Sequence, residues 1–122
     1  TSRWSTKSSG AVAHWLYFYR EGVVDMQTWI ILMNLTDPGI KNIKEAGNRI
    51  EAGVKLLEAM GGKMHGFYAT LGEYDYVTIG EVPDDETGMS FLLALGSLGN
   101  VRTTALKAFP QKEFVKIVKK LK

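Results

Sequence analysis

The chain contains no cysteine among its 122 residues, so it has no disulfide framework, no cysteine-based metal site and no thiol nucleophile. Positive and negative charges are nearly balanced, since the chain has 15 Lys and Arg and 13 Asp and Glu. A net charge of +2 gives no argument for binding nucleic acid or an anionic membrane. The apolar runs fall far short of the roughly 20 residues that cross a bilayer.

The amino-acid composition is that of an ordinary globular domain. The chain is 45% hydrophobic and 23% charged, which is typical of soluble proteins. Its length suits one domain rather than two. No cluster of His, Asp and Glu has the spacing of metal ligands, so the sequence predicts no metal and no cofactor.

The first 25 residues differ from the rest. Residues 1–10 are rich in Ser, Thr and Lys, and residues 11–19 end in a dense aromatic cluster. A secretory signal is disfavoured, because His14 interrupts the short apolar region and no small-residue cleavage site follows it. We therefore expect a cytoplasmic protein with an N-terminal extension, 1–25. That extension is either foreign to the natural protein, with translation starting at Met26, or an arm that docks on the domain or a neighbouring subunit.

Periodicity predicts the order strand, helix, strand, strand, helix, strand, followed by a short helix that begins at Pro110. Asp37 is the expected N-cap of the first helix, with Pro38 at its first position and Gly61-Gly62 at its end. The expected ranges of the six main elements are 28–35, 38–60, 63–71, 74–82, 83–98 and 101–109.

This order is the ferredoxin-like α+β arrangement, βαββαβ, with an added C-terminal helix. The first strand is apolar on both faces, with Trp29 and Ile31 on one side and Ile30 and Leu32 on the other. A sheet covered by helices on one face should instead alternate apolar and polar residues. We therefore expect a second copy to cover the other face, so that the two sheets pack face to face as a dimeric α/β barrel.

Four runs of the chain form a distinctive pattern: ILMNLTDPGIKNIKEA, MGGKMHGFYATLGEYDYV, EVPDDET and LLALGSLGNVRTTALKAF. With them, residues 26–121 resemble the GYD-domain family. The motif for which the family is named corresponds to Gly72, Tyr74 and Asp75, and a second signature spans 99–104. The resemblance implies a small ferredoxin-like domain over residues 26–122, dimeric or larger, with no assigned biochemical function.

Tyr74 and Asp75 follow the predicted turn and are candidate ligand-binding residues. As a functional pair, a hydroxyl and a carboxylate at the mouth of a pocket suit hydrogen bonding or general-base work. As structural residues, Asp75 would accept backbone N–H bonds and Tyr74 would cover the sheet edge.

Three more residues are candidates for the same site, each with a structural alternative. His65 either lines a pocket or lies satisfied at the surface, because a lone histidine cannot build a zinc site. Arg102 either binds a carboxylate or phosphate through two parallel hydrogen bonds from its guanidinium, or forms a structural salt bridge with Asp75 or Glu73. Asn34, the polar residue of the first strand, lines a small polar cavity or pins the strand end.

Strand register decides which of these residues meet. We prefer a three-residue loop, 72–74, which pairs His65 with Glu81 and Phe67 with Ile79, over a two-residue loop that would flip one strand. In the preferred register Asn34, His65 and Asp75 share the helix side of the sheet. The predicted pocket then lies there, near the 72–75 turn.

The sequence thus predicts a homo-oligomeric module that binds a small ligand between sheet and helices. A cofactor-free enzyme acting on a small organic substrate and a purely structural assembly protein are the alternatives, since no catalytic triad is legible. Nucleic acid is disfavoured as a partner, because residues 74–76 place an acid where RNA-binding sheets carry basic and aromatic side chains.

Overall fold

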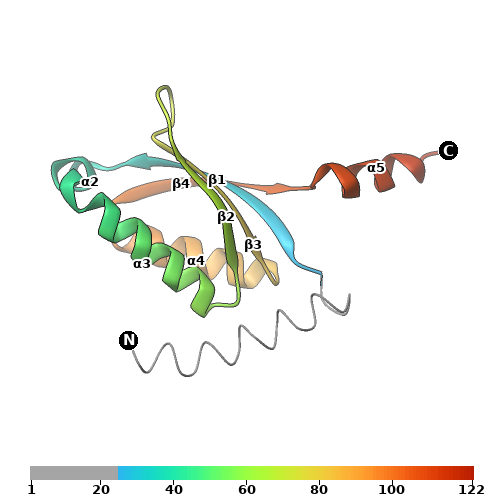
Figure 1. Ribbon diagram of the computed structural model, residues 1–122, viewed down its shortest axis with the longest axis horizontal. Helices are drawn as coiled ribbons and strands as arrows, with labels where there is room; N and C mark the ends of the chain where they lie inside the picture. The colour runs from blue at the N-terminus through green and yellow to red at the C-terminus, as the bar shows by residue number, and fades with distance from the viewer. Residues whose placement is uncertain (1–24) are drawn as a thin grey trace.

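The computed structural model describes residues 25–122, so nearly all of the predicted extension lies outside the described part. Residues 25–122 form four strands and four α-helices, with a 3-10 turn between the first two helices (Figure 1). Their bounds are β1 Gln27–Leu35, α2 Asp37–Lys41, η1 Ile43–Glu45, α3 Ala46–Ala59, β2 Lys63–Ala69, β3 Tyr76–Val82, α4 Asp85–Ser97, β4 Val101–Ala108 and α5 Gln111–Lys119.

The strands form one antiparallel sheet in the order β2-β3-β1-β4. Helices α3 and α4 lie side by side on one face of this sheet (Figure 1). This order and this one-sided cover are the ferredoxin-like α+β fold, which confirms the predicted fold class.

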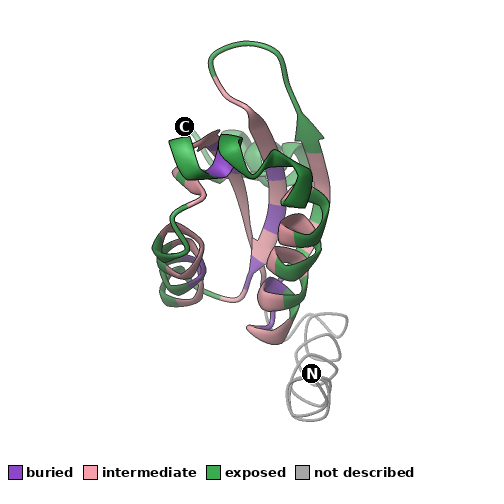
Figure 2. Ribbon diagram, turned by 90° about the vertical axis from the view of Figure 1, so that its left-hand side faces the viewer, coloured by how far each residue is buried: buried purple, intermediate pink, exposed green. Residues whose placement is uncertain are grey.

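The core lies between the sheet and the two helices (Figure 2). Alternate residues of β1, Ile31 and Met33, are buried there beneath Leu57 of α3 and Phe91 of α4. Side chains alternate across a strand, so the other parity of β1 must point away from the helices.

The first predicted helix is broken into three pieces, which corrects the expectation of one continuous helix. The side-chain amide of Asn42 donates to the carbonyl oxygen of Pro38, 3.0 Å away, so it competes with the regular backbone pattern. The N-cap is also one residue earlier than expected, because the Thr36 hydroxyl accepts from the Gly39 N–H at 3.2 Å.

The hairpin register differs from the preferred one. Phe67 pairs with Thr78 and Gly66 with Ile79, and a bulge at His65 shifts the pairing beyond it. Phe67 faces the helices, and so do Tyr76 and Thr78 of β3, where the preferred register would place Val77 and Ile79. The strands also end earlier than predicted, leaving residues 70–75 as the connection, with Gly72 at a φ of 137° that favours glycine.

The opposite face of the sheet carries no helix among the described residues. Two rows of residues, each running from β2 across β3 and β1 to β4, cross its centre. The first row is Gly66, Ile79, Ile30 and Leu106, and the second is Tyr68, Val77, Leu32 and Thr104. We call this surface the open face. Beyond it, α5 extends away from the body of the domain, and every one of its residues is exposed (Figure 1).

In the part of the chain from Asp25 onward, no helix has both the length and the apolar character needed to cross a membrane.

Candidate functional site

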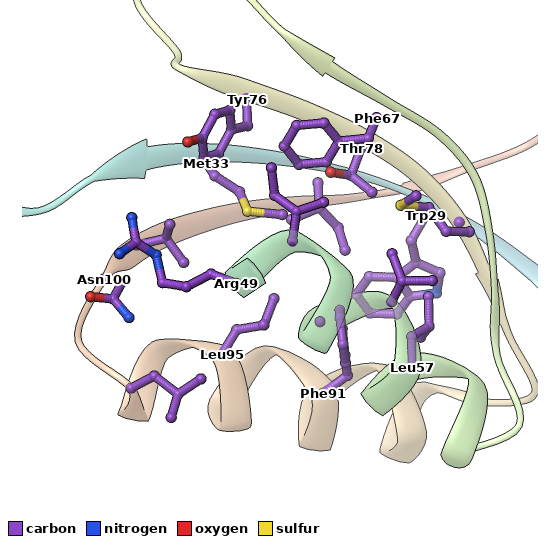
Figure 3. Close-up of a pocket in the computed structure, with 18 of the residues that line it drawn as sticks. Trp29, Met33, Arg49, Leu57, Phe67, Tyr76, Thr78, Phe91, Leu95 and Asn100 are labelled. Atoms are coloured by element: carbon purple, nitrogen blue, oxygen red, sulfur yellow. The ribbon is translucent and has the colours of Figure 1, made fainter. Parts of the chain in front are cut away.

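A cavity of about 110 Å³ lies between the sheet and helices α3 and α4 (Figure 3). Its walls are almost entirely apolar. Aromatic rings come from three strands and one helix, and aliphatic side chains of α3 and α4 close the other side. The main wall residues are Trp29, Met33, Leu57, Phe67, Tyr76, Phe91 and Leu95.

Thr78 is the buried polar side chain in this wall. It is only 6% exposed, it lies in the middle of β3, and it borders the cavity (Figure 3). Its hydroxyl oxygen has no hydrogen-bond partner among the described residues. A buried hydroxyl without a partner costs folding free energy, so its presence in an otherwise apolar wall requires an explanation.

Arg49 and Asn100 lie together at one end of the cavity (Figure 3). The guanidinium of Arg49 donates to the carbonyl oxygens of Asn42, at 2.9 Å, and Gly39, at 3.1 Å. These carbonyls lie in and just after α2, where a helix presents unpaired acceptors and favours a positive charge. Arg49 therefore caps the C-terminal end of α2 while it borders the cavity.

Asp75 is bonded to the backbone of β1. Its carboxylate accepts from the Leu35 N–H at 2.8 Å, and its own N–H donates to the Met33 carbonyl oxygen at 2.9 Å. The connection is closed by the Thr70 N–H, which donates to the Asp75 carbonyl oxygen at 2.9 Å. Asp75 thus ties the β2–β3 connection to the end of β1.

The other predicted site residues do not converge on the cavity. Asn34 and Arg102 are register partners on the face opposite the helices, which corrects the expected helix-side position of Asn34. His65 lies at the bulge, where its Nε2 pairs with the Glu81 carboxylate, as the preferred hairpin had placed these two residues together. Neither His65 nor Tyr74 borders the cavity. A ligand-binding role for Asn34, His65, Tyr74, Asp75 and Arg102 stays a prediction.

Sequence reasoning missed Thr78 and the rings of Trp29, Tyr76 and Phe91 in the wall. The available signal was parity, since Thr78 is a polar residue that shares the side of β3 with Tyr76 and Val82. That signal depends on the register of the β2–β3 hairpin. The preferred register paired Phe67 with Ile79, whereas Phe67 pairs with Thr78 in the structure.

Asp84 is the N-cap residue of α4. The pKa of Asp84 lies below its ordinary value, because its carboxylate accepts a hydrogen bond from the Thr87 N–H at 2.8 Å as the N-cap of α4. Residues 25–122 hold no group of three or more His, Cys, Asp or Glu placed to bind a metal ion.

A ferredoxin-like α+β domain with an apolar cavity under its helices is the class of protein that these features define. Two solved structures from Mycobacterium tuberculosis share the fold. They are the leucine response regulatory protein (18% identity, TM-score 0.53, covering 84% of this chain and 73% of that one) and the feast or famine regulatory protein complexed with L-methionine (17% identity, TM-score 0.55, covering 90% and 80%).

Residues 29–118 match the GYD domain, and the chain belongs to that family. The chain is also similar to a Thermus thermophilus protein named glutamine synthetase and cystathionine beta-lyase binding protein. The two are 35% identical over 91 residues, which span 74% of this chain and 96% of that protein.

The two family signatures have structural places in this fold. The first holds the β2–β3 connection through Gly72 and Asp75. In the second, the Asn100 carbonyl oxygen accepts from the Thr36 N–H at 3.0 Å and lies where any side chain on Gly39 would collide with it. Both signatures therefore secure the C-terminal end of β1.

Proposed function

We propose that this chain is a cytoplasmic, homo-oligomeric module that binds a small molecule in the cavity between its sheet and helices. The observation that carries the proposal is the unpartnered Thr78 hydroxyl in an apolar wall. A ligand that hydrogen-bonds to Thr78 would satisfy the buried group, and its apolar part would fill the remaining space. A few polar groups in a mainly apolar cavity are what small-ligand sites have in common.

Binding is favoured over catalysis because the two charged residues that border the cavity already have bonding partners. Arg49 is engaged by the carbonyls at the end of α2, and Glu81 is paired with His65. Neither is left to act as an acid or base on a bound molecule. The cofactor-free enzyme is therefore the weaker alternative.

Self-association is supported by the open face. Its central rows are apolar, and a sheet that faced water there would carry polar residues instead. A second copy, docked through the same surface by a two-fold axis, would cover both sheets at once. A standard stable interface buries about 800 Å² on each partner, which is the scale of one small sheet face.

A second candidate function is binding to another protein. The relative from Thermus thermophilus is named for binding two enzymes. In this chain α5 presents an apolar stripe with no described residues packed over it, formed by Phe114, Ile117 and Val118 and continued by Leu121 just after the helix. Such a helix face suits a groove on a partner.

A fragment screen on isotope-labelled protein tests the ligand-binding proposal. We expect small apolar fragments to shift the NMR signals of the Trp29 indole, Thr78 and Phe91, and to leave those around Arg102 unchanged. Replacing Phe114 and Ile117 with serine is the matched control, because it removes the α5 stripe and should not alter these shifts. Shifts confined to the open face or to α5 would reject the cavity as the site.

A further inference from the structure

The walls of the cavity restrict what it can hold, and the argument that follows rests on the proposed ligand-binding function. We infer that the ligand is a neutral, ring-shaped molecule of about the size of phenol that presents a single hydrogen-bonding group to Thr78. Size, shape and polarity support this separately.

The size follows from the cavity volume of about 110 Å³. An engineered apolar cavity of ~150 Å³ in another protein stays dry and binds benzene. A somewhat smaller space, partly open at its edge, therefore accepts one small ring and excludes a fused ring system or a long chain.

The shape follows from the aromatic walls. Phe67 and Tyr76 lie with ring centroids 4.9 Å apart and planes tilted by 49°, and Trp29 and Phe91 face them across the cavity (Figure 3). Gly88 allows this arrangement, because an added Cβ there would lie only 3.0 Å from the Trp29 ring. Aromatic walls prefer a flat guest that packs in offset or edge-to-face geometry.

The polarity follows from the buried Thr78 hydroxyl, which has no hydrogen-bond partner among the described residues. The Thr78 hydroxyl both donates and accepts, so it suits an alcohol, a phenol or a carbonyl. A charged ligand is disfavoured, because the walls around Thr78 are almost entirely apolar and the charged guanidinium of Arg49 lies at the end of the cavity, with two of its N–H groups bonded to carbonyl oxygens. Burying an unpaired charge costs far more than burying a neutral polar group.

The test compares phenol, benzene and benzoate by NMR titration on the full chain. We expect phenol to bind about tenfold more tightly than benzene, as one net hydrogen bond would give, and benzoate to bind more weakly than phenol. In Thr78→Val the advantage of phenol over benzene should disappear while the affinity for benzene is kept. In Thr78→Ser, which retains the hydroxyl, the preference for phenol should remain.

The outcomes separate this inference from the function on which it rests. Equal affinities for phenol and benzene in the wild type, tighter binding of benzoate, or a phenol preference that survives Thr78→Val would overturn the inference and leave a small-molecule site in place. Failure of all three compounds to bind the folded wild-type protein would overturn the proposed function itself.

Discussion

The carboxylate of Asp75 and the hydroxyl of Thr78 lie in neighbouring parts of the sheet and have opposite hydrogen-bonding situations. The first accepts a 2.8 Å bond from a backbone N–H of β1, and the second has no partner among the described residues. An engaged polar group stabilises the fold, whereas an unengaged buried one weakens it and is available to a ligand. At the residue scale this contrast favours a structural role for Asp75 and a binding role for Thr78.

Asp75→Ala should destabilise the protein by about 2 kcal/mol, because the Leu35 N–H loses a charged acceptor in a partly buried position. Urea unfolding measures this loss, and fragment affinity for the cavity should be unchanged. His65→Ala is the matched comparison. It removes only a pairing at a half-exposed site, so we expect it to cost less than about 1 kcal/mol. Loss of ligand binding in a stably folded Asp75→Ala protein would show instead that Asp75 is a ligand-binding residue.

At the scale of single elements, caps and interruptions set where the helices begin and end. Helix α4 begins at an acid whose carboxylate binds the first turn, and α2 begins at a threonine that does the same. The chain between α2 and α3 bends at Asn42, and Arg49 ties that bend back to α3. These local hydrogen bonds position α3 and α4, the helices that form one side of the cavity.

The Asp84 cap gives a pH-dependent contribution to stability. Because the folded state lowers the pKa of Asp84, the contribution is fully present above the ordinary aspartate value of about 3.9 and is lost as the pH falls through the folded pKa. Asp84→Ala should cost about 1 kcal/mol at neutral pH. Asp84→Asn keeps a capping oxygen but does not titrate, so its stability relative to wild type should rise as the pH falls below 4 in urea unfolding experiments. An identical acid response in both proteins would contradict this role.

Two glycines of α3 form a matched pair for testing the cavity wall. An added Cβ at Gly47 meets nothing within 4 Å, and one at Gly53, which borders the cavity, comes 3.8 Å from Leu95. Each change to alanine should stabilise the helix by roughly 0.5–1 kcal/mol, measured by thermal or urea unfolding. Only Gly53→Ala should also weaken fragment binding, because its methyl group takes up space in the wall. Equal affinities in the two variants would argue against a ligand between α3 and the sheet.

At the scale of the whole molecule, one face of the sheet is roofed by α3 and α4, and the open face has no cover among the described residues. The apolar surface left there is continuous across all four strands, from Gly66 and Tyr68 of β2 to Leu106 of β4. A surface of this kind marks an interaction site rather than a solvated face.

The chain should sediment at micromolar concentration with at least twice the 13.6 kDa mass of one copy. Ile79→Lys places a charge in the centre of the open face and should shift the protein toward monomer. Leu71→Lys, at a fully exposed position in the β2–β3 connection, is the control and should not alter the mass. A clean 13.6 kDa species for the wild type would reject self-association through this face.

Much of this architecture was legible in the sequence because it depends on local or periodic signals. The apolar run of β1, the spacing of apolar residues in the helices and the turn residues predicted the ferredoxin-like order and most element ranges. Asp84 and the glycines after α3 marked helix ends through chemistry that acts within one turn. Such signals need only the neighbours of a residue along the chain.

Tertiary structure alone decided the register of the β2–β3 hairpin, the break at Asn42 and the identity of the cavity wall. The register depends on whether Tyr76 and Thr78 or Val77 and Ile79 of β3 lie under the helices, and that balance involves α3 and α4 rather than the hairpin itself. A one-residue error there exchanges the two faces of β3, which is why Thr78 was overlooked. The sequence by itself determined the kinds of element and their order, because these depend on short-range periodicity. The place of each side chain in the site was decided only when all the layers packed together.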